Sequence, residues 1–291
     1  MRHALSALSL VFAATLSVSC FDDDCGCDAA SGRITVAVAD KNYDNAGQIA
    51  GQERRDEGLP FAAYLTGLAL WRQAEGAPAA EMFRPRFLPG DAEATIDPAW
   101  LLPGANRLLL VGNEPLRPQG ASDSLFVREL HPGGDESADL YVGWEDVVAP
   151  LRSDRTVRMF RAKGKLLILP DGLPSDVVGI EATVDNLYRN VGRDLSYADS
   201  AGVVKRFALT RAAGELSLLA APGRAPGSLS TVTLRLVKRD GASLTLSNIP
   251  AAIRRNRISV IRPICDTTSG VWSLEVFADG RWTQVEELHI D

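Results

Sequence analysis

The feature that most limits the fold of this chain is a two-residue alternation of apolar and polar side chains. Ile34, Val36 and Val38 alternate with Thr35 and alanines, as one face of a half-buried strand requires. Similar short runs follow, separated by turns rich in Gly, Pro and Asp. The runs assigned to strands are 65–71, 108–111, 140–142, 157–160, 165–169, 177–184, 203–210, 231–237, 243–246 and 257–261. Short strands at this spacing predict an all-β protein of the sandwich type.

The C-terminal part of the chain is expected to end in a hairpin. Its turn is Ala278-Asp279-Gly280, and Asp-Gly between alternating strands is a strong hairpin signal. Residues 285–290 are expected to close the edge of the second sandwich, and a strand donated to a neighbouring molecule is the alternative. Helix signals are few: residues 249–256 and residues 141–148 each predict one short helix.

Length and composition favour two β-sandwich domains in tandem. The chain has 291 residues, of which 46% are hydrophobic, enough for a substantial core. A loop rich in Asp, Gly and Pro ends near residue 150, where a fresh run of strands begins. We therefore expect an N-terminal sandwich over residues 33–150 and a C-terminal sandwich over residues 151–291.

The first residues predict an export signal. Arg2 supplies a positive charge, and residues 4–16 form an uncharged run of mostly apolar side chains. This run is shorter than the roughly 20 apolar residues that a bilayer-spanning helix needs, but it has the length and flanks of a secretory signal peptide. We expect residues 1–19 to be removed. No second apolar run approaches membrane length, so membrane attachment is expected through a lipid.

Cys20 is the expected site of that lipid. Val18 and Ser19 lead directly into it, an arrangement that resembles the lipobox of bacterial lipoproteins, whose cysteine is acylated and becomes the mature N-terminus. Residues 20–32 would then be a lipidated tether. Several acyl chains on one cysteine hold firmly, whereas a single chain anchors only marginally. The alternative is a plain secreted protein with a buried thiol.

An acidic run begins two residues after Cys20. Asp22, Asp23 and Asp24 resemble the mark that sends some Gram-negative lipoproteins to the outer leaflet of the outer membrane. A solvated acidic linker would have the same composition.

The remaining cysteines leave the disulfide pattern open. Outside the cytoplasm thiols tend to be oxidised, so one bridge is expected, either Cys25–Cys27 or a link from one of these to Cys265. A zinc site is not expected. Cys25 and Cys27 are one residue apart, whereas zinc-binding cysteines are usually spaced by about two to four residues, and no histidine lies nearby.

Charge and motifs argue against nucleic-acid binding and against catalysis. The formal net charge is −6 and no run of Lys and Arg is present, so the chain lacks the electrostatic signature of a nucleic-acid partner. Nucleophile-elbow and zincin motifs are absent, and His131 and His289 have no Ser or Cys close in sequence. We expect neither enzyme activity nor a cofactor.

Two further patterns favour structural interpretations. Residues 40–51 place oxygens at alternate positions, as a calcium loop does, but Asn45 stands where that loop needs glycine and Gly51 where it needs glutamate. We interpret this segment as the exit loop of the first strand, with no metal. The five tryptophans are spread evenly along the chain, which predicts core and rim positions rather than a sugar-binding platform.

The order of five short motifs resembles the FimB-like anchor and accessory lipoproteins of type V fimbriae, in the fimbrillin superfamily. After the lipid cysteine come a first strand, a second strand ending in a polar turn, a Pro-Gly strand leading to a Gly-Asn corner, a Leu-Tyr segment before the second domain, and a late strand preceded by arginines. In this chain they are Arg33–Val38, Leu65–Arg72, Leu102–Asn113, Asp139–Gly143 and Arg254–Val260.

The resemblance implies two transthyretin-like β-sandwich domains and a mechanical function. Subunits of this kind build surface fibres by exchanging strands, and an anchor subunit keeps its lipid to hold the fibre base. The implied partners are fimbrial stalk subunits and outer-membrane lipid, and the implied location is the cell surface. The alternative function is a glycan- or protein-binding surface lipoprotein outside any fibre.

An arginine pair bears on the choice between subunit types. Arg54 and Arg55 lie in the polar loop 52–58. In stalk subunits of the family an arginine-specific protease cuts in the N-terminal region, whereas an anchor is expected to stay uncut. A solvated turn explains the same residues.

Overall fold

A computed structural model describes residues 32–77, 81–113, 127–210, 215–224, 229–266, 268–278, 280–285 and 289–290. It confirms the all-β prediction. Within these residues the elements are strands β1–β18 and short 3₁₀ turns such as η1 (Phe61–Ala63), and none is an α-helix. No helix in this part of the chain is therefore long and apolar enough to cross a membrane.

One seven-stranded sheet forms the N-terminal unit, in the order β3-β2-β5-β7-β8-β1-β4. The sheet folds over on itself, because β7 and β8 pair only at Tyr141–Arg161 and Val142–Phe160. Side chains of its two halves therefore enclose a shared apolar core. The strands are β1 (Ile34–Val38), β2 (Leu68–Ala74), β3 (Glu81–Phe83), β4 (Ala94–Ile96), β5 (Gly104–Gly112), β7 (Tyr141–Ala149) and β8 (Arg155–Arg161).

The C-terminal unit consists of two sheets, of six and five strands, with a second apolar core between them. The six-stranded sheet has the order β11-β10-β13-β14-β18, with β6 also paired to β10. Its strands are β6 (Val127–Glu129), β10 (Val177–Gly192), β11 (Tyr197–Ala208), β13 (Ser230–Lys238), β14 (Ser243–Ala251) and β18 (His289–Ile290). The five-stranded sheet has the order β12-β9-β15-β16-β17. Its strands are β9 (Gly164–Ile168), β12 (Leu216–Ala220), β15 (Ile258–Cys265), β16 (Trp272–Ala278) and β17 (Arg281–Val285).

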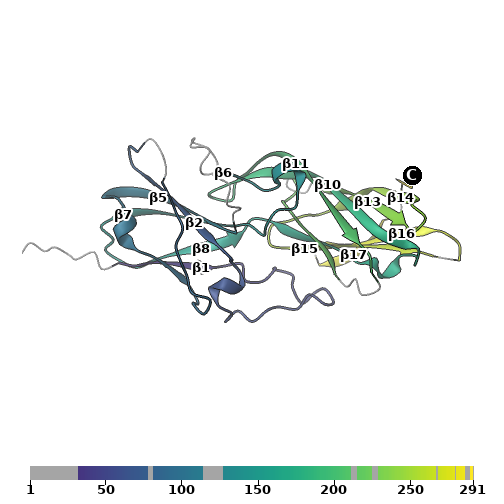
Figure 1. Ribbon diagram of the computed structural model, residues 1–291, viewed down its shortest axis with the longest axis horizontal. Coiled ribbons are helices and arrows are strands. Elements are labelled where there is room, and N and C mark those ends of the chain that lie inside the picture. Colours follow the sequence, from purple (N-terminus) through teal and green to yellow (C-terminus); the bar gives the residue numbers. More distant parts are fainter. Residues whose placement is uncertain are drawn as a thin grey trace, which may run out of the picture.

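The two units lie end to end along the long axis of the molecule (Figure 1). The sheets divide the chain between β8 and β9 and not at the expected position, residue 150. Strand β8 follows that position and completes the N-terminal unit, while β6 precedes it and pairs with β10 of the C-terminal unit. Each unit therefore contains one strand from the other side of residue 150: β8 in the N-terminal unit and β6 in the C-terminal unit.

Both expected helices are wrong. Residues 141–148 belong to β7, and residues 249–256 begin in β14 and end in a turn. A bulge explains the second error. The register of β14 on β13 shifts between Val232 and Leu234, and Asn248 in the bulge has a φ of 60°. The expected C-terminal hairpin is confirmed, since Ala278 pairs with Arg281 across the turn.

Strands with continuous apolar runs are covered on both faces. In β5, Leu108 and Leu110 face the core of the N-terminal unit, whereas Leu109 and Val111 join the core of the C-terminal unit. In β9, Leu166 and Ile168 point into the C-terminal core and Leu167 points the other way, into a small apolar cluster on the outer face. Such runs are typical of strands without a solvated face.

Candidate functional site: strand β1 and its strap

Strand β1 is a central strand of the N-terminal unit. It pairs antiparallel with β4 on one side and parallel with β8 on the other, in register from Ile34–Arg155 to Val38–Met159. Ile34 and Val36 are fully buried. Burying a side chain of this size stabilises a fold by about 1.5–3 kcal/mol, so β1 is an integral part of the core.

The segment that follows β1 connects the two units. We call residues 39–60 the strap. It leaves β1, passes along the C-terminal unit beneath β15 and returns to η1 of the N-terminal unit (Figure 1). Only backbone turns and side-chain contacts hold it in place, because it contains no strand or helix.

An asparagine fastens the strap to β15. The Asn45 side chain is 3% exposed, and it donates to the Ile258 carbonyl at 2.8 Å while accepting from the Ile258 N–H at 2.9 Å. The amide thus acts as one more strand position beside β15. Next to it, the Asp44 N–H donates to the Asn256 carbonyl, and the Asp44 carboxylate accepts from the Asn256 side chain at 2.8 Å.

Apolar and polar contacts complete the attachment. Ile49 of the strap is buried against Leu167, Val260 and Phe277 on the outer face of the five-stranded sheet. Gln52 then donates to Glu215 at 2.7 Å and accepts from Lys165, also at the edge of this sheet. The oxygen-rich pattern of residues 40–51 therefore serves protein contacts. Within the described part of the chain, no cluster of three or more metal-binding side chains occurs.

Arg161 is the centre of a polar network where the strap starts. The guanidinium of this buried arginine pairs with Asp139 at 2.9 Å and also donates to the Tyr141 hydroxyl and the Asn256 side chain. Its Cζ atom lies 4.1 Å from the ring centre of Tyr43 in the strap. Asp40 accepts from the Arg161 backbone N–H at 2.9 Å and from the Arg255 guanidinium.

Burial dominates the electrostatics of this network. It raises the pKa of Asp139 even though Arg161 acts in the opposite direction, and it raises the pKa of Tyr43 and Tyr141 well above the usual range. Buried ionic groups are weak evidence for stability, because desolvation offsets the attraction, and they are better suited to fixing one arrangement of the units.

The arginine pair lies on the exposed part of the strap. The Arg54 side chain is 53% exposed and pairs with Glu57 at 2.8 Å. Arg55 is exposed too, but Asn42 accepts from its backbone N–H at 2.7 Å and donates to its carbonyl at 3.2 Å. A protease must bind its substrate in an extended form. The two hydrogen bonds with Asn42 hold the backbone of Arg55 in place and therefore oppose cleavage next to it.

His131 has a structural position that its sequence did not indicate. It is 2% exposed, accepts from the Ala221 N–H at 2.8 Å through Nε2, and donates to the Asp135 carbonyl at 3.2 Å through Nδ1. This pattern needs the neutral ring. Burial, reinforced by the charge of Lys163, lowers the pKa of His131 to about 4.

Most of the expected site residues lie outside the described part of the chain. These are Cys20, Asp22, Asp23, Asp24, Cys25 and Cys27. Their roles in lipidation, export and disulfide formation stay predictions. Cys265 is described: it is half-buried at the end of β15 that points away from the N-terminal unit.

The tryptophans occupy core and rim positions, as predicted. Trp71 is buried, Trp282 is 43% exposed, and the other three are intermediate. Trp100, Trp144 and Trp282 each contact a different phenylalanine, so these rings form no shared platform.

Solved structures share this fold, although no family model and no curated protein sequence matches the chain. A proposed polysaccharide-binding protein from Bacteroides thetaiotaomicron is 12% identical, with a TM-score of 0.51 over 88% of this chain and 99% of the other. A proposed cell-adhesion protein from Bacteroides ovatus is 13% identical, with a TM-score of 0.49 over 89% and 96%. The fimbrial anchor protein Mfa2 from Porphyromonas gingivalis is 9% identical, with a TM-score of 0.45 over 86% and 98%.

Proposed function

We propose that this protein is a lipid-anchored structural subunit of a type V fimbria, an anchor or accessory subunit that assembles by β-strand exchange. In this proposal Cys20 carries the lipid and Asp22–Asp24 direct the protein to the outer face of the outer membrane. Its partners are fimbrial stalk subunits, and it performs no chemical reaction and needs no cofactor. The two units are assigned to the two transthyretin-like β-sandwich domains that the sequence resemblance implies.

The observation that carries the proposal is the position of β1. The strand begins at the end of the N-terminal unit that points away from the C-terminal unit (Figure 1), and only a short tether separates it from Cys20. A pull on the body of the protein would load β1 along its length against β4 and β8. Hydrogen bonds loaded in this direction must break together, so β1 is suited to transmit force to a lipid.

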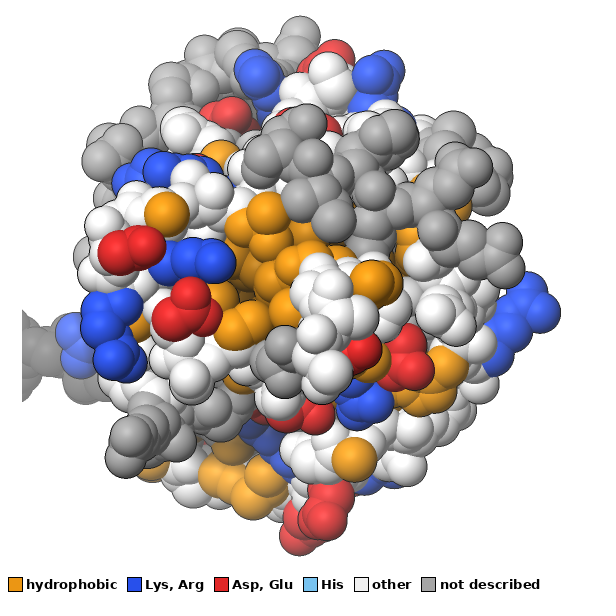
Figure 2. All heavy atoms as spheres, turned by 90° about the vertical axis from the view of Figure 1, so that its right-hand side faces the viewer, with side chains coloured by type: hydrophobic (Ala, Val, Ile, Leu, Met, Phe, Trp, Pro, Cys, Tyr) orange, Lys and Arg blue, Asp and Glu red, His pale blue; other side chains and the backbone are white. Residues whose placement is uncertain are grey.

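The opposite end of the molecule suits a neighbouring subunit. Figure 2 shows apolar side chains gathered in a hollow at the end of the C-terminal unit. A cavity of about 750 Å³ at this end has a mixed lining, with apolar residues such as Leu173, Val177 and Leu209 beside charged Arg239 and Arg262. Among the described residues, the outer edge of β14 is paired only at Leu246 and Ser247. A sheet edge with unpaired backbone groups can accept a strand from another chain, and an apolar hollow can receive its side chains.

The geometry also bears on the expected disulfide. Cys265 lies at the far end of the C-terminal unit, whereas Gly32 adjoins the start of β1 at the other end of the molecule. Five residues from Cys27 to Gly32 reach at most about 18 Å at roughly 3.5 Å per residue. We therefore favour a Cys25–Cys27 bridge over a link to Cys265 within one chain.

Replacing the lipid cysteine tests the proposal. With Cys20→Ala, we expect the protein and its attached fibres to appear in the medium, because the anchor has lost its membrane lipid. Cys27→Ala is the matched control, and it should leave both on the cell. Immunoblots of cells, medium and sheared fibres would measure this. Release of the protein alone, with fibres still on the cell, would contradict the anchor role and favour a separate glycan- or protein-binding lipoprotein.

A further inference from the structure

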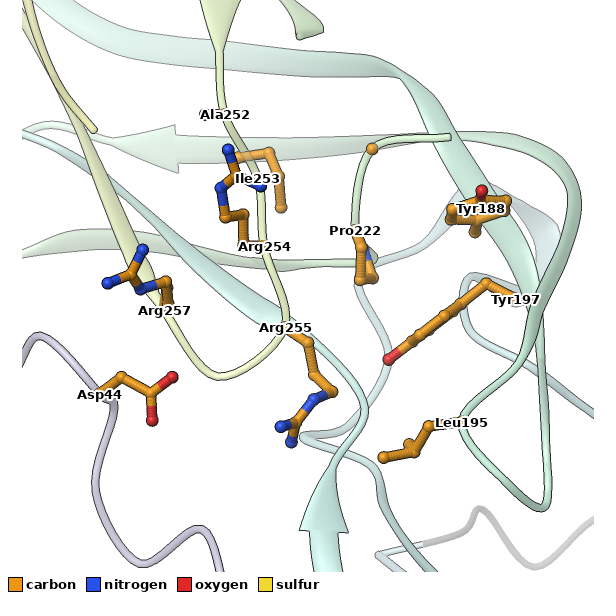
Figure 3. Close-up of a pocket in the computed structure, with 11 residues that line it drawn as sticks. Asp44, Tyr188, Leu195, Tyr197, Pro222, Ala252, Ile253, Arg254, Arg255 and Arg257 are labelled. Atoms are coloured by element: carbon orange, nitrogen blue, oxygen red, sulfur yellow. The ribbon is translucent and has the colours of Figure 1, made fainter. Parts of the chain in front are cut away.

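A pocket beside the junction of the two units combines arginines with aromatic rings. Its volume is about 520 Å³, within the range of roughly 300–1,000 Å³ typical of small-molecule sites. One wall is the turn 252–257, which contributes Arg254, Arg255 and Arg257. Tyr188 and Tyr197 stand on the opposite side (Figure 3).

The arginines give the pocket a charge opposite to that of the whole chain. Three of its lining residues are cationic and one, Asp44, is acidic, whereas the formal net charge of the protein is −6; of the three, Arg255 is also paired with Asp40, which lies outside the lining. Asp44 already accepts a hydrogen bond from the Asn256 side chain at 2.8 Å. Guanidinium groups bind planar carboxylates through two parallel hydrogen bonds, so this wall favours an anionic ligand.

Hydrogen bonds to residues outside the pocket hold the arginine turn in place. Asn256 is 2% exposed, and its backbone N–H donates to the Lys163 carbonyl at 2.9 Å. Arg255 makes its hydrogen bonds to Asp40 and to the Arg161 carbonyl through Nη1 alone, within the described part of the chain. A wall that is already ordered loses little conformational entropy when a ligand binds.

The aromatic side of the pocket is fixed as well. The rings of Tyr188 and Tyr197 are half-buried and nearly parallel, with centroids 5.4 Å apart and an interplanar angle of 31°. The Tyr197 hydroxyl donates to the Ala162 carbonyl at 2.9 Å. Leu195 and Pro222 extend this apolar surface. Aromatic faces of this kind can pack against the C–H face of a sugar ring.

We propose that this pocket binds an acidic carbohydrate, a sugar whose ring carries a carboxylate, with the carboxylate on the arginine turn and the ring against the two tyrosines. The combination of walls distinguishes this ligand from its two closest alternatives. A neutral sugar would leave the arginine wall unused, and an acidic peptide would not need the aromatic face. The site does not depend on fibre assembly, so it can be tested on the single chain.

Isothermal titration calorimetry of the soluble Cys20→Ala chain tests this site, with a short oligomer of galacturonic acid as the probe. We expect saturable binding that weakens with salt and is absent for the neutral galactose oligomer. The double variant Arg254→Gln/Arg257→Gln should bind at least about tenfold more weakly, and Tyr188→Ala about fivefold more weakly. The control Arg235→Gln removes one positive charge from the exposed face of β13, away from the pocket, and it should change affinity by less than about twofold.

Three results would overturn the proposal. The first is no saturable binding of the uronate oligomer at millimolar concentration. The second is equal binding by the uronate and neutral oligomers, or by an oligo-aspartate peptide. The third is unchanged affinity in the double variant. The unfolding temperature of each variant, measured alongside, shows whether a loss of binding reflects a loss of fold.

Discussion

Single polar side chains decide how the two units of this protein are joined. Asn45 pairs with both backbone groups of Ile258, and the Arg161 guanidinium donates hydrogen bonds to residues of both units, Tyr141 and Asn256. The contacts between the units do not follow from the local sequence, because Ile258 lies 213 residues from Asn45 and Asn256 lies 95 residues from Arg161 along the chain. In the sequence, Asn45 stands out only because it occupies a position where a calcium-binding loop needs glycine. Its hydrogen bonds to the Ile258 backbone depend on the fold and are not apparent from the sequence.

Because His131 is buried as a neutral ring, we expect the free energy of unfolding to decrease measurably in acid. Its pKa is about 4 in the folded protein, below the ordinary value of 6.5, so the unfolded chain binds more protons between these values. The stabilising contribution of the neutral ring is complete above pH 6.5 and is lost as the pH falls towards 4. One such group changes the free energy of unfolding by at most about 1.4 kcal/mol per pH unit. His131→Gln should flatten this part of the profile.

Urea unfolding between pH 4 and pH 7 would measure the effect, as the difference between the parent and the variant. His289→Gln is the matched control, because it also removes one histidine but leaves His131 in place, and it should keep the parent slope. An unchanged slope in His131→Gln would show that the buried ring does not titrate as described.

At the scale of elements, β1 is the strand whose loss should matter most. Thr35 lies in its middle, and its hydroxyl contacts that of Thr156 in β8 at 3.0 Å. Thr35→Pro removes a backbone N–H from a central strand and should cost roughly 3 kcal/mol of unfolding free energy. Thr35→Val keeps the backbone and loses only the hydroxyl contact, so it should cost less than about 1 kcal/mol.

Chemical denaturation of both variants in the soluble Cys20→Ala background would measure these costs. Equal stability of Thr35→Pro and Thr35→Val would mean that β1 is dispensable to the fold. The force path from the body of the protein to the lipid would then have to run elsewhere.

The strands themselves were largely predictable, but their partners were not. Period-two alternation located β1, and Asp279-Gly280 located the β16–β17 hairpin. The same local signals could not show that β8 pairs with β1 rather than with later strands, because that choice depends on packing between distant segments. The false helix at 249–256 arose because a bulge at Asn248 interrupts the alternation of β14.

A signal for the strap was present in the sequence. Leu166, Leu167 and Ile168 are apolar in succession, which indicates a strand covered on both faces. On the outer face of the sheet, Ile49 of the strap covers Leu167. The identity of the covering segment could not be read from β9, since any apolar residue of the chain could have supplied it.

At the scale of the whole molecule, the two units follow one another along the long axis. In the proposed function, a lipidated Cys20 and its tether precede β1, the N-terminal unit follows, and the C-terminal unit presents its apolar hollow at the far end (Figures 1 and 2). The strap joins the two units along one side. In this arrangement the strap is the covalent link between β1, on the lipid side, and the rest of the chain. A cut at Arg54 or Arg55 would break that link and leave β1 held by non-covalent contacts alone.

The N-terminus of the surface-exposed protein therefore tests the anchor role most directly. Mass spectrometry of the protein recovered from sheared fibres and from outer membranes would identify it. For an anchor we expect an intact chain that begins at an acylated Cys20 and contains both Arg54 and Arg55. A mature protein that begins at Arg55 or Asp56, without lipid, would contradict the anchor role and indicate a stalk subunit that has given up β1.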